Sequence, residues 1–384
     1  MKKTYDTGPE PVKAYLVGMR SRDISVSEAS ALTAELAGLA DTLGLEISGG
    51  ETVNIREKNP RYCMGSGKAE EIAQKAVESG AECIVFDAEI SPTQQRNWES
   101  LSGLSAVDRQ ELIIRIFASR ARTREAELQA GLAELLYALP RLSHKYIDLS
   151  RQRGGRYGTR GSGETRLETD RRLIEQRIGA LKTELEEVRK NRGVQRKQRE
   201  RSGVPVCALV GYTNAGKSSL HHALTGSGVY VEDKLFATLD PTARRTRTPS
   251  GKNIILVDTV GFIRRLPHNL VDAFRSTLEE AARSDLLLHV LDISDPAAGE
   301  HTAAVLSVLR ELGAEQIPLI TVYNKADLLD PRAGSMADGR AAGDFAEGGI
   351  PQGVLISAVK KEGLAELWEL VEKQLAFDGK ALKN

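Results

Sequence analysis

The sequence has few cysteines and no long apolar run, and each shortage excludes a class of protein. Its three cysteines, Cys63, Cys83 and Cys207, form no C-x-x-C pair, so neither a disulfide framework nor a zinc site is expected. No apolar run approaches the roughly 18 residues of a membrane-spanning helix, and the N-terminal residues include no apolar signal segment. We therefore expect a soluble cytoplasmic protein in which Cys83 and Cys207 are buried in strands.

The chain also lacks an excess of either charge, because 53 basic residues balance 53 acidic ones. The distribution is uneven, however, since residues 141–201 hold 18 Lys and Arg against 9 Asp and Glu. Such asymmetry is typical of a segment that meets a polyanion. A solvated charged helix is the alternative that charge alone leaves open.

The length of 384 residues predicts two or three domains, and the first part of the chain indicates a small parallel α/β domain over 1–107. Compact apolar runs alternate there with apolar residues at helical spacing, which is typical of such a sheet. We expect strands at Val12–Met19 and Cys83–Asp87 and helices at Ser27–Leu43 and Lys68–Ser79, the second helix ended by Gly80.

A glycine-rich stretch in this domain, Met64–Lys68, resembles a phosphate loop only in part. Tyr62 stands where the first glycine of such a loop belongs, and Ala69 follows the lysine in place of Ser or Thr. A turn that leads into a helix is the better interpretation.

The middle of the chain, 108–201, predicts a long helical hairpin. Apolar residues step by three and four positions through Leu128, Leu132, Leu135 and Leu139, and through Ile174, Ile178, Leu181, Leu185 and Val188. We expect two long helices, 108–142 and 164–200, packed antiparallel. An ordinary α-helical subdomain folded back on its neighbour is the alternative.

Within the connection between these helices, about 143–166, the stretch Arg151–Glu164 alternates arginine with glycine. Glycine lets the backbone approach another surface closely, and arginine supplies charge, hydrogen-bonding forks and stacking faces. This composition favours a nucleic acid partner, although a merely flexible loop is the other interpretation. The candidate RNA-binding residues are Arg151, Arg153, Arg156, Tyr157, Arg160 and Arg166.

Four elements of a guanine nucleotide site follow one another in the last part of the chain. They are Gly211–Ser218, which fits G-x-x-x-x-G-K-[ST], then Asp258–Gly261, Asn324–Asp327 and Ser357-Ala358. Their order predicts a Ras-like P-loop G domain over 202–376, followed by a short polar tail, 377–384. The expected strands are Val204–Val210, Ile254–Asp258, Asp285–Asp292, Ile317–Tyr323 and Gly353–Ile356, with a surface loop at Pro331–Gln352 and a last helix at Gly363–Leu375.

The first element is a candidate phosphate-binding loop. Its backbone N–H groups open a helix and form an anion nest, to which the helix dipole adds. Lys217 is expected to reach the β- and γ-phosphates, and the Ser218 hydroxyl to ligate Mg²⁺. The candidate residues are Gly211, Tyr212, Thr213, Asn214, Ala215, Gly216, Lys217, Ser218 and Ser219.

The remaining elements predict contacts to the metal, the γ-phosphate and the base. Asp258 is placed to hold Mg²⁺ through a water, and the N–H of Gly261 to meet the γ-phosphate. Asp327 can accept two hydrogen bonds from the guanine N1 and N2 edge, which adenine does not offer, so we expect GTP in preference to ATP. The other candidates are Asn324, Lys325, which covers the base plane, Ser357 and Ala358, whose N–H meets the guanine oxygen.

The first switch must supply a threonine to Mg²⁺ and the γ-phosphate, and only Phe236–Thr242 offers one at a suitable place. We choose Thr238 over Thr242 and include Phe236 in the site. The catalytic set is then Lys217, Thr238 and Gly261.

The position after Gly261 is Phe262, where Ras-like proteins carry a glutamine that orients the attacking water. Slow intrinsic hydrolysis is therefore expected, with the missing group supplied by a partner, a cation or the switches. Asn214 stands where some GTPases coordinate K⁺, so a K⁺ requirement is a further hypothesis.

Specific strings outside the nucleotide motifs make the chain similar to the HflX family of translational GTPases over nearly its whole length. They are Ser91-Pro-Thr-Gln-Gln-Arg96, Pro140-Arg-Leu142, Gly161-Ser-Gly-Glu-Thr-Arg-Leu-Glu-Thr-Asp-Arg-Arg172, Phe236-Ala-Thr-Leu-Asp-Pro-Thr242 and Phe262 after Asp-Thr-Val-Gly. The resemblance implies an N-terminal α/β domain, a long helical hairpin and a Ras-like G domain.

The resemblance also implies a function. Family members bind the large ribosomal subunit, with the hairpin loop reaching rRNA near the peptidyl-transferase centre. They split stalled or idle ribosomes in a GTP-dependent manner, and the ribosome stimulates hydrolysis. We expect a monomer with these properties. An RNA-binding scaffold with incidental GTP turnover and an Obg-like factor that binds precursor subunits are the alternatives.

Overall fold

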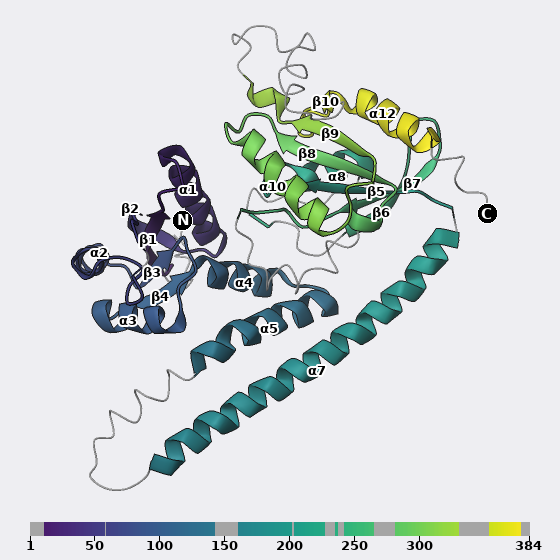
Figure 1. The fold of residues 1–384 in the computed structure, drawn as a ribbon. Coiled ribbons are helices and arrows are strands. Elements are labelled where there is room, and N and C mark those ends of the chain that lie inside the picture. Colours follow the sequence, from purple (N-terminus) through teal and green to yellow (C-terminus); the bar gives the residue numbers. More distant parts are fainter. Residues whose placement is uncertain are drawn as a thin grey trace, which may run out of the picture. The chain divides into compact units, whose positions relative to one another are not determined.

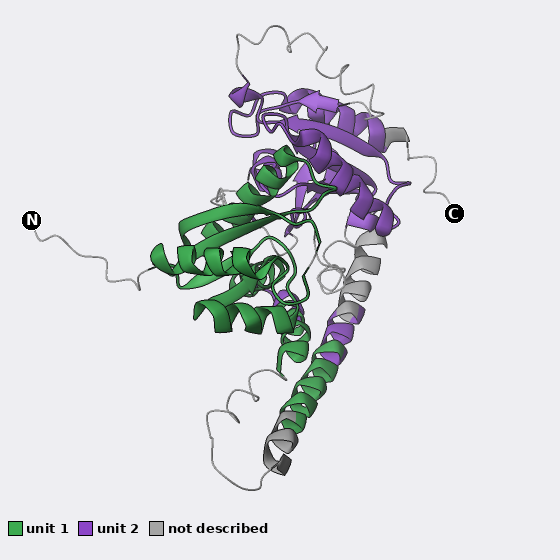
Figure 2. Cartoon of the chain, turned by 60° about the vertical axis from the view of Figure 1, so that its left-hand side comes forward, with its two compact units in different colours: residues 1–119, 130–182 green, residues 120–129, 183–384 purple. Residues whose placement is uncertain are grey.

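The computed structural model describes residues 11–57, 59–142, 160–201, 203–226, 235–236, 242–264, 281–329 and 353–377. Within its longest helix, side chains are described for Glu168–Val188 and for Lys190. The chain divides into two compact units, residues 1–119 with 130–182 and residues 120–129 with 183–384 (Figure 2).

The first unit contains the predicted parallel sheet (Figure 1). Its strands are β1 (Lys13–Arg20), β2 (Glu46–Asn54), β3 (Cys83–Phe86) and β4 (Ser105–Asp108), in the order β2-β1-β3-β4. All three strand pairs are parallel. The prediction of a small parallel α/β sheet is therefore confirmed, whereas the strands β2 and β4 were not predicted.

Helices α1 (Val26–Thr42), α2 (Ser66–Glu78) and α3 (Pro92–Ser102) connect these strands. The hydroxyl of Ser25 accepts a hydrogen bond from the N–H of Glu28 and caps α1, and Gly80 follows α2 with φ 72°, a left-handed conformation that glycine adopts easily. The buried Trp98 of α3 contacts Tyr62 and Phe86 in the core.

The stretch Met64–Lys68 leads into α2, whose N-cap is Gly65. It follows a connection from the end of β2 at Asn54. The interpretation as a turn before a helix, rather than a second phosphate loop, agrees with this position.

The expectation of one long helix over 108–142 is wrong. Two helices occupy this range, α4 (Arg109–Arg120) and α5 (Arg124–Ala138), followed by the short 3-10 helix η1 (Leu139–Arg141). The break is stabilised by Thr123, whose hydroxyl accepts a hydrogen bond from the N–H of Ala126 at the start of α5. Threonine is a favoured N-cap, and the apolar spacing on either side of it concealed this local stop.

The second long helix is confirmed as α7 (Arg160–Arg201), with 42 residues, or about 63 Å at 1.5 Å per residue. Arg124 near the start of α5 pairs with Glu184, whereas Gly131 further along α5 lies against Leu181. Residue numbers rise along one helix as they fall along the other, so the two are antiparallel. The arms of the hairpin are unequal, because α5 has only 15 residues.

The second unit is built on a six-stranded sheet of order β10-β9-β8-β5-β7-β6. Its strands are β5 (Val206–Gly211), β6 (Thr242–Arg247), β7 (Asn253–Asp258), β8 (Leu286–Asp292), β9 (Leu319–Asn324) and β10 (Gly353–Leu355). Five strands confirm the prediction and run parallel, whereas β6 pairs antiparallel with β7 and was not predicted.

Helices lie on both faces of this sheet (Figure 1). The core of one face combines β5, β8 and β9 with α8 (Lys217–Thr225) and α12 (Leu364–Phe377). The helix α10 (Ala298–Glu311) lies on the other face, where Ala298 packs with Leu291 of β8. Successive side chains of a strand point to opposite faces, so Leu291 points away from the first core. The short helices η2 (Ala281–Arg283) and η3 (Ala326–Leu328) complete the described elements.

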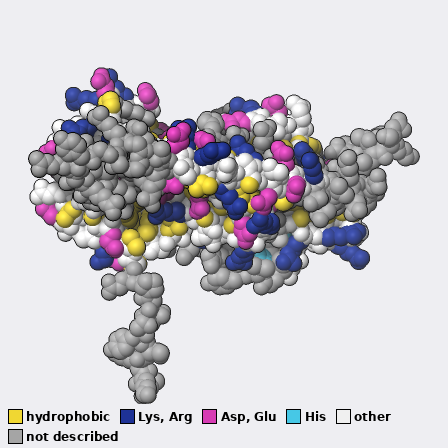
Figure 3. All heavy atoms as spheres, turned by 90° about the horizontal axis from the view of Figure 1, so that it is seen from below, with side chains coloured by type: hydrophobic (Ala, Val, Ile, Leu, Met, Phe, Trp, Pro, Cys, Tyr) yellow, Lys and Arg dark blue, Asp and Glu magenta, His cyan; other side chains and the backbone are white. Residues whose placement is uncertain are grey.

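Acidic and basic side chains are interspersed over much of the face that Figure 3 shows. None of the described helices combines the length and the apolar character that crossing a bilayer requires.

Candidate nucleotide site

The motifs of the last part of the chain meet at the carboxyl edge of the six-stranded sheet. Gly211 ends β5, Asp258 ends β7, and Asn324 ends β9 directly beside Asp292 of β8. Ligands of open α/β sheets bind outside this edge, because the loops that follow parallel strands gather there.

The loop between β5 and α8 forms an anion-binding nest. Asn214 and Gly216 adopt left-handed backbone conformations, with φ 61° and 89°, and α8 begins at Lys217. This alternation turns successive N–H groups toward one point at a helix N-terminus, which suits a phosphate group. Position 216 requires glycine, because its φ is positive and a Cβ there would collide with Nδ2 of Asn324.

Lys217 is buried at the centre of this loop. Its ammonium group donates a hydrogen bond to the carbonyl oxygen of Tyr212 over 2.7 Å. Burial lowers the pKa of Lys217 to about 8, and the negative charge of Asp258 opposes this shift only in part. A phosphate group at the nest would supply the charge partner that the buried ammonium needs.

Ser218 and Asp258 bring two oxygen ligands together beside the nest. The Ser218 hydroxyl donates to Oδ2 of Asp258 over 2.7 Å. Hydroxyl and carboxylate oxygens suit Mg²⁺, which usually takes one or two protein ligands and completes its shell with phosphate and water. Across the described residues no cluster of three His, Cys, Asp or Glu forms a separate metal site. The pair therefore fits a Mg²⁺ that is shared with phosphates.

The segment after Asp258 is hydrogen-bonded to the phosphate loop. The N–H of Phe262 donates to the carbonyl oxygen of Gly211 over 3.0 Å, and the N–H of Thr213 donates to that of Phe262 over 2.8 Å. A Cβ at Gly261 would lie 2.8 Å from Cα of Thr213 and 3.0 Å from Nζ of Lys217. The backbone at 261 is thus within reach of a group that Lys217 binds.

A contact that the sequence did not suggest fixes the same segment from its other side. The Tyr212 ring stacks on His301 of α10, with ring centroids 3.7 Å apart, and its hydroxyl accepts a hydrogen bond from the N–H of Arg264. The Arg264 guanidinium pairs with Glu300 of α10 over 2.7 Å. Residues of the phosphate loop, of the segment after Asp258 and of α10 are therefore held as one unit.

Asn324 connects the loop after β9 to two other loops. Its Nδ2 donates to the carbonyl oxygen of Ala215 over 2.9 Å, and its Oδ1 accepts from the N–H of Ala358 over 3.0 Å. Lys325 follows with φ 65°, and its ammonium pairs with Asp292 over 2.7 Å. Asp292 was missed by the sequence reasoning, although its position at the end of a predicted strand could have suggested it.

Asp327 is held by the last motif. The hydroxyl of Ser357 donates to Oδ1 of Asp327 over 2.6 Å and accepts from the N–H of Lys360 over 3.1 Å. The hydrogen bond from Ser357 is the main cause that lowers the pKa of Asp327. The carboxylate is therefore ionised and oriented, as an acceptor for two N–H groups of a base must be.

Ser219 lies half-buried in α8, and Phe236 is buried with φ 54°, its carbonyl oxygen accepting from Nη1 of Arg120 over 3.0 Å. Thr238, Arg151, Arg153, Arg156 and Tyr157 lie outside the described residues. Arg160 and Arg166 lie in α7, but their side chains are not described. Thr242, the alternative to Thr238, begins β6 opposite Asp258.

Three family descriptions together match most of the chain. Residues 30–118 match "GTP-binding GTPase N-terminal", residues 120–199 match "GTP-binding GTPase Middle Region", and residues 206–325 match "50S ribosome-binding GTPase". The boundary between the first two falls in the last turn of α4, just before the break that separates it from α5.

Known proteins are similar in sequence to most of this chain. "GTPase HflX" of Caldanaerobacter subterraneus is 48% identical over 89% of this chain and 76% of its own length. "GTPase HflX" of Escherichia coli K12 is 41% identical over 97% of this chain and 84% of its own length. The fold is similar to that of SsGBP in its complex with GDP, with a TM-score of 0.53 and 24% identity over 94% of this chain and 98% of that one.

Proposed function

Because the chain belongs to the HflX family of GTPases, we propose that it binds the large ribosomal subunit and uses the GTP cycle to split or rescue stalled or idle ribosomes. GTP hydrolysis and association with ribosomes follow from membership of this family. We propose in addition that the large subunit is the target, that ribosomes are split or rescued, and that the ribosome stimulates hydrolysis.

The observation that carries the proposal is the hydrogen bonding between the phosphate loop and Phe262. This pairing holds Gly261 close to the Lys217 ammonium, where a γ-phosphate would lie. The segment that starts at Gly261 can therefore contact the γ-phosphate of a triphosphate, whereas a diphosphate lacks this group. Such a difference in contacts is what a nucleotide-dependent change of partner affinity requires.

In this proposal Lys217 exchanges the carbonyl oxygen of Tyr212 for the β- and γ-phosphates. Ser218 and, through a water, Asp258 would hold Mg²⁺, and Thr238 would supply the first-switch ligand. The ion would neutralise charge on the terminal phosphates. The N–H of Gly261 meets the γ-phosphate, so that Lys217, Thr238 and Gly261 form the catalytic set.

The base is read by Asn324, Lys325, Asp327, Ser357 and Ala358. The ionised Asp327 accepts the two guanine N–H groups, and Ser357 holds it in place. The N–H of Ala358, which donates to Asn324, is the candidate partner of the guanine oxygen.

The residue that follows Gly261 cannot orient the attacking water. Phe262 is buried, and its ring has no hydrogen-bonding atom. We therefore propose slow intrinsic hydrolysis that the ribosome accelerates. Asn214 is exposed at the nest, so K⁺ is a candidate cofactor, and equal rates in K⁺ and Na⁺ would exclude it.

The charge distribution supports an RNA partner for the hairpin. Residues 141–167 contain 7 Lys and Arg against 2 Asp and Glu, and residues 189–201 contain 7 against 1, whereas residues 168–188 contain 4 against 6. Charged side chains that serve only to keep a helix in solution would not need to concentrate positive charge at both ends of this region. We propose that Arg151, Arg153, Arg156, Tyr157, Arg160 and Arg166 bind rRNA.

Cosedimentation with mature large subunits tests the proposal. Wild-type protein with a non-hydrolysable GTP analogue should bind at least about tenfold more tightly than with GDP, as a nucleotide switch requires. A variant with alanine at Arg151, Arg153 and Arg156 should keep its basal GTPase rate and lose ribosome stimulation. Equal binding with GTP analogue, GDP and no nucleotide would contradict the proposal, as would binding to precursor subunits alone.

A further inference from the structure

Tyr212 of the phosphate loop connects a helix to a backbone segment within the second unit. The residue is buried, and its ring stacks on the imidazole of His301, with 11° between the ring planes and 3.7 Å between the centroids. Its hydroxyl accepts a hydrogen bond from the N–H of Arg264 over 2.8 Å. Tyrosine suits this place because it combines an apolar ring with one polar tip.

The hydrogen bond from Arg264 continues a pairing that the backbone begins. Tyr212 and Phe262 form an isolated parallel bridge. The N–H of Phe262 donates to the carbonyl oxygen of Gly211, and the N–H of Thr213 donates to that of Phe262. The Tyr212 hydroxyl takes the N–H two residues further along. Three hydrogen bonds therefore fix this segment, two through the backbone and one through a side chain.

Two successive residues of α10 support this arrangement. His301 carries the Tyr212 ring, and its Nδ1 lies 3.5 Å from Oδ2 of Asp295, in the turn before the helix. Glu300 pairs with the Arg264 guanidinium over 2.7 Å. The Glu300 side chain is 61% exposed, and an ion pair with so exposed a partner contributes little. The stacked ring and its hydroxyl therefore supply most of the constraint.

This constraint acts next to the residue that would meet the γ-phosphate. Gly261 directly precedes the paired segment, and a Cβ there would lie 3.0 Å from Nζ of Lys217. A triphosphate needs the Gly261 N–H in that place, whereas a diphosphate lacks the group that would contact it. A segment that is already held loses less conformational entropy on binding, so the constraint raises the affinity for a triphosphate and not for a diphosphate.

We propose that Tyr212 is a positioning residue for the γ-phosphate, because its stacked ring and its hydroxyl hold the segment that starts at Gly261 where that segment binds a triphosphate. Tyr212 thereby sets how strongly the site prefers GTP to GDP. Its role rests on the proposed function in one respect, the contact of the Gly261 N–H with the γ-phosphate. The phosphate-loop motif assigns nothing to this side chain, since 212 is one of its four unspecified positions.

The test compares Tyr212→Phe with wild-type protein in the binding of GDP and of a non-hydrolysable GTP analogue. Phenylalanine keeps the ring on His301 and removes the hydroxyl that accepts from Arg264. The affinity for the analogue should fall about threefold to tenfold, the effect of one lost hydrogen bond, while the affinity for GDP stays unchanged. Calorimetric titration measures both. An unchanged affinity for the analogue would overturn the proposal, as would an equal loss for the two nucleotides.

His301→Ala tests the stack separately, because it removes the support of the Tyr212 ring and leaves the hydroxyl in the chain. The ratio of analogue affinity to GDP affinity should fall as it does in Tyr212→Phe. His301→Phe provides another aromatic face and should restore the ratio. A wild-type ratio in His301→Ala would overturn the part of the proposal that concerns the stack.

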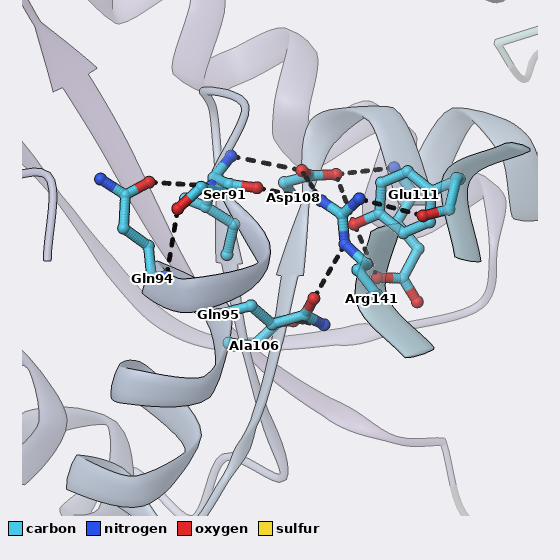
Figure 4. A network of polar contacts seen from close by, with 9 residues as sticks. Ser91, Gln94, Gln95, Ala106, Asp108, Glu111 and Arg141 are labelled. Carbon is cyan, nitrogen blue, oxygen red and sulfur yellow. Dashed lines mark hydrogen bonds and ion pairs between the residues drawn. The ribbon is translucent and has the colours of Figure 1, made fainter. Parts of the chain in front are cut away.

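Tyr137→Phe is the matched control. The guanidinium of Arg141 lies on the Tyr137 ring, 3.5 Å from its centroid, and the hydroxyl donates to Oδ1 of Asp108 over 3.1 Å. Asp108, Arg141 and Gln95 belong to one polar network of the first unit (Figure 4), whose residues include none of the four nucleotide motifs. The control should lower the melting temperature and leave both nucleotide affinities unchanged. If it lowered their ratio as Tyr212→Phe does, the proposal would fail.

Gly261→Ala separates the role of Tyr212 from the proposed function. A Cβ at this position would lie 2.8 Å from Cα of Thr213, so the backbone must shift and the ratio of analogue affinity to GDP affinity should fall. A wild-type ratio in Gly261→Ala would refute the γ-phosphate contact, and the proposed nucleotide switch with it. If the ratio falls in Gly261→Ala and not in Tyr212→Phe, the positioning role alone fails. In the double variant Tyr212→Phe should add nothing, because the contact that it supports is already lost.

Discussion

The side-chain amide of Asn324 donates a hydrogen bond to the carbonyl oxygen of Ala215 over 2.9 Å and thereby ties the base loop to the phosphate loop. The same side chain accepts from Ala358, so one residue holds three loops of the nucleotide site. A residue with both a donor and an acceptor on a short side chain is needed there, and asparagine offers them.

Asn324→Ala should weaken GDP binding strongly and reduce the free energy of unfolding by about 1–3 kcal/mol, because two buried groups lose their partners. Titration calorimetry and chemical denaturation measure the two effects. Thr302→Val is the control, since it removes a buried hydroxyl that bonds only within α10. It should lower stability without changing nucleotide affinity. Unchanged GDP affinity in Asn324→Ala would show that the loops are held by other contacts.

Asp327→Asn should exchange guanine for xanthine selectivity. The amide still accepts the hydrogen bond from Ser357, but it presents a donor where the guanine N–H groups lie. We expect GTP affinity to fall by about tenfold or more, the cost of unpaired buried groups, while xanthosine triphosphate gains. Competition binding with both nucleotides measures the ratio. An unchanged ratio would mean that Asp327 does not contact the base.

Nucleotide affinity should fall as the pH rises above about 8. Burial lowers the pKa of Lys217 to about 8, so the nucleotide-free protein loses this positive charge in that range. Bound phosphates favour the charged form, and binding then takes up a proton, which weakens affinity by up to about tenfold per pH unit. Calorimetry at pH 8.5 in buffers of different ionisation enthalpy detects the proton.

Lys217→Arg is the control for this pH dependence, because a guanidinium stays charged throughout the range. The titration of guanine itself is common to both proteins and cancels in the comparison. A parallel fall of affinity in wild type and variant would assign the effect to another group.

His289 of β8 should make the second unit less stable in mild acid. The side chain is buried beside Thr321, and neither ring nitrogen has a hydrogen-bond partner within the described ranges. Burial, and secondarily the charge of Lys217, lowers the pKa of His289 to about 4. The unfolded chain binds this proton at its ordinary pKa, so stability is lost as the pH falls from about 6.5 to about 4, by up to about 3 kcal/mol.

His289→Leu should remove that part of the acid sensitivity, as measured by urea denaturation from pH 7 to pH 4. Thr321→Val, at the neighbouring register position, is the control that changes packing without removing a titrating group. An identical pH slope in wild type and His289→Leu would exclude the histidine as the cause.

The sequence predicted the strands of the nucleotide-binding sheet where an apolar run ends in a motif, as at Val210 and Asp258. It failed where local patterns mislead. β6 (Thr242–Arg247) is polar and mostly exposed, and only its antiparallel pairing with β7 makes it a strand. The break at Thr123 lies within continuous helical spacing, so a single capping residue decided it.

The proposed nucleotide chemistry follows from the sequence itself. A phosphate nest, a metal pair and a base reader depend on residue types at set spacing, because the backbone of a strand and its following loop places them. Tertiary structure alone decided the contacts of Tyr212 with His301, of Asn324 with Ala215, and of Arg141 with Asp108. These partners are 33 to 109 positions apart, and sheet order and register, which short-range periodicity does not encode, determine which of them meet.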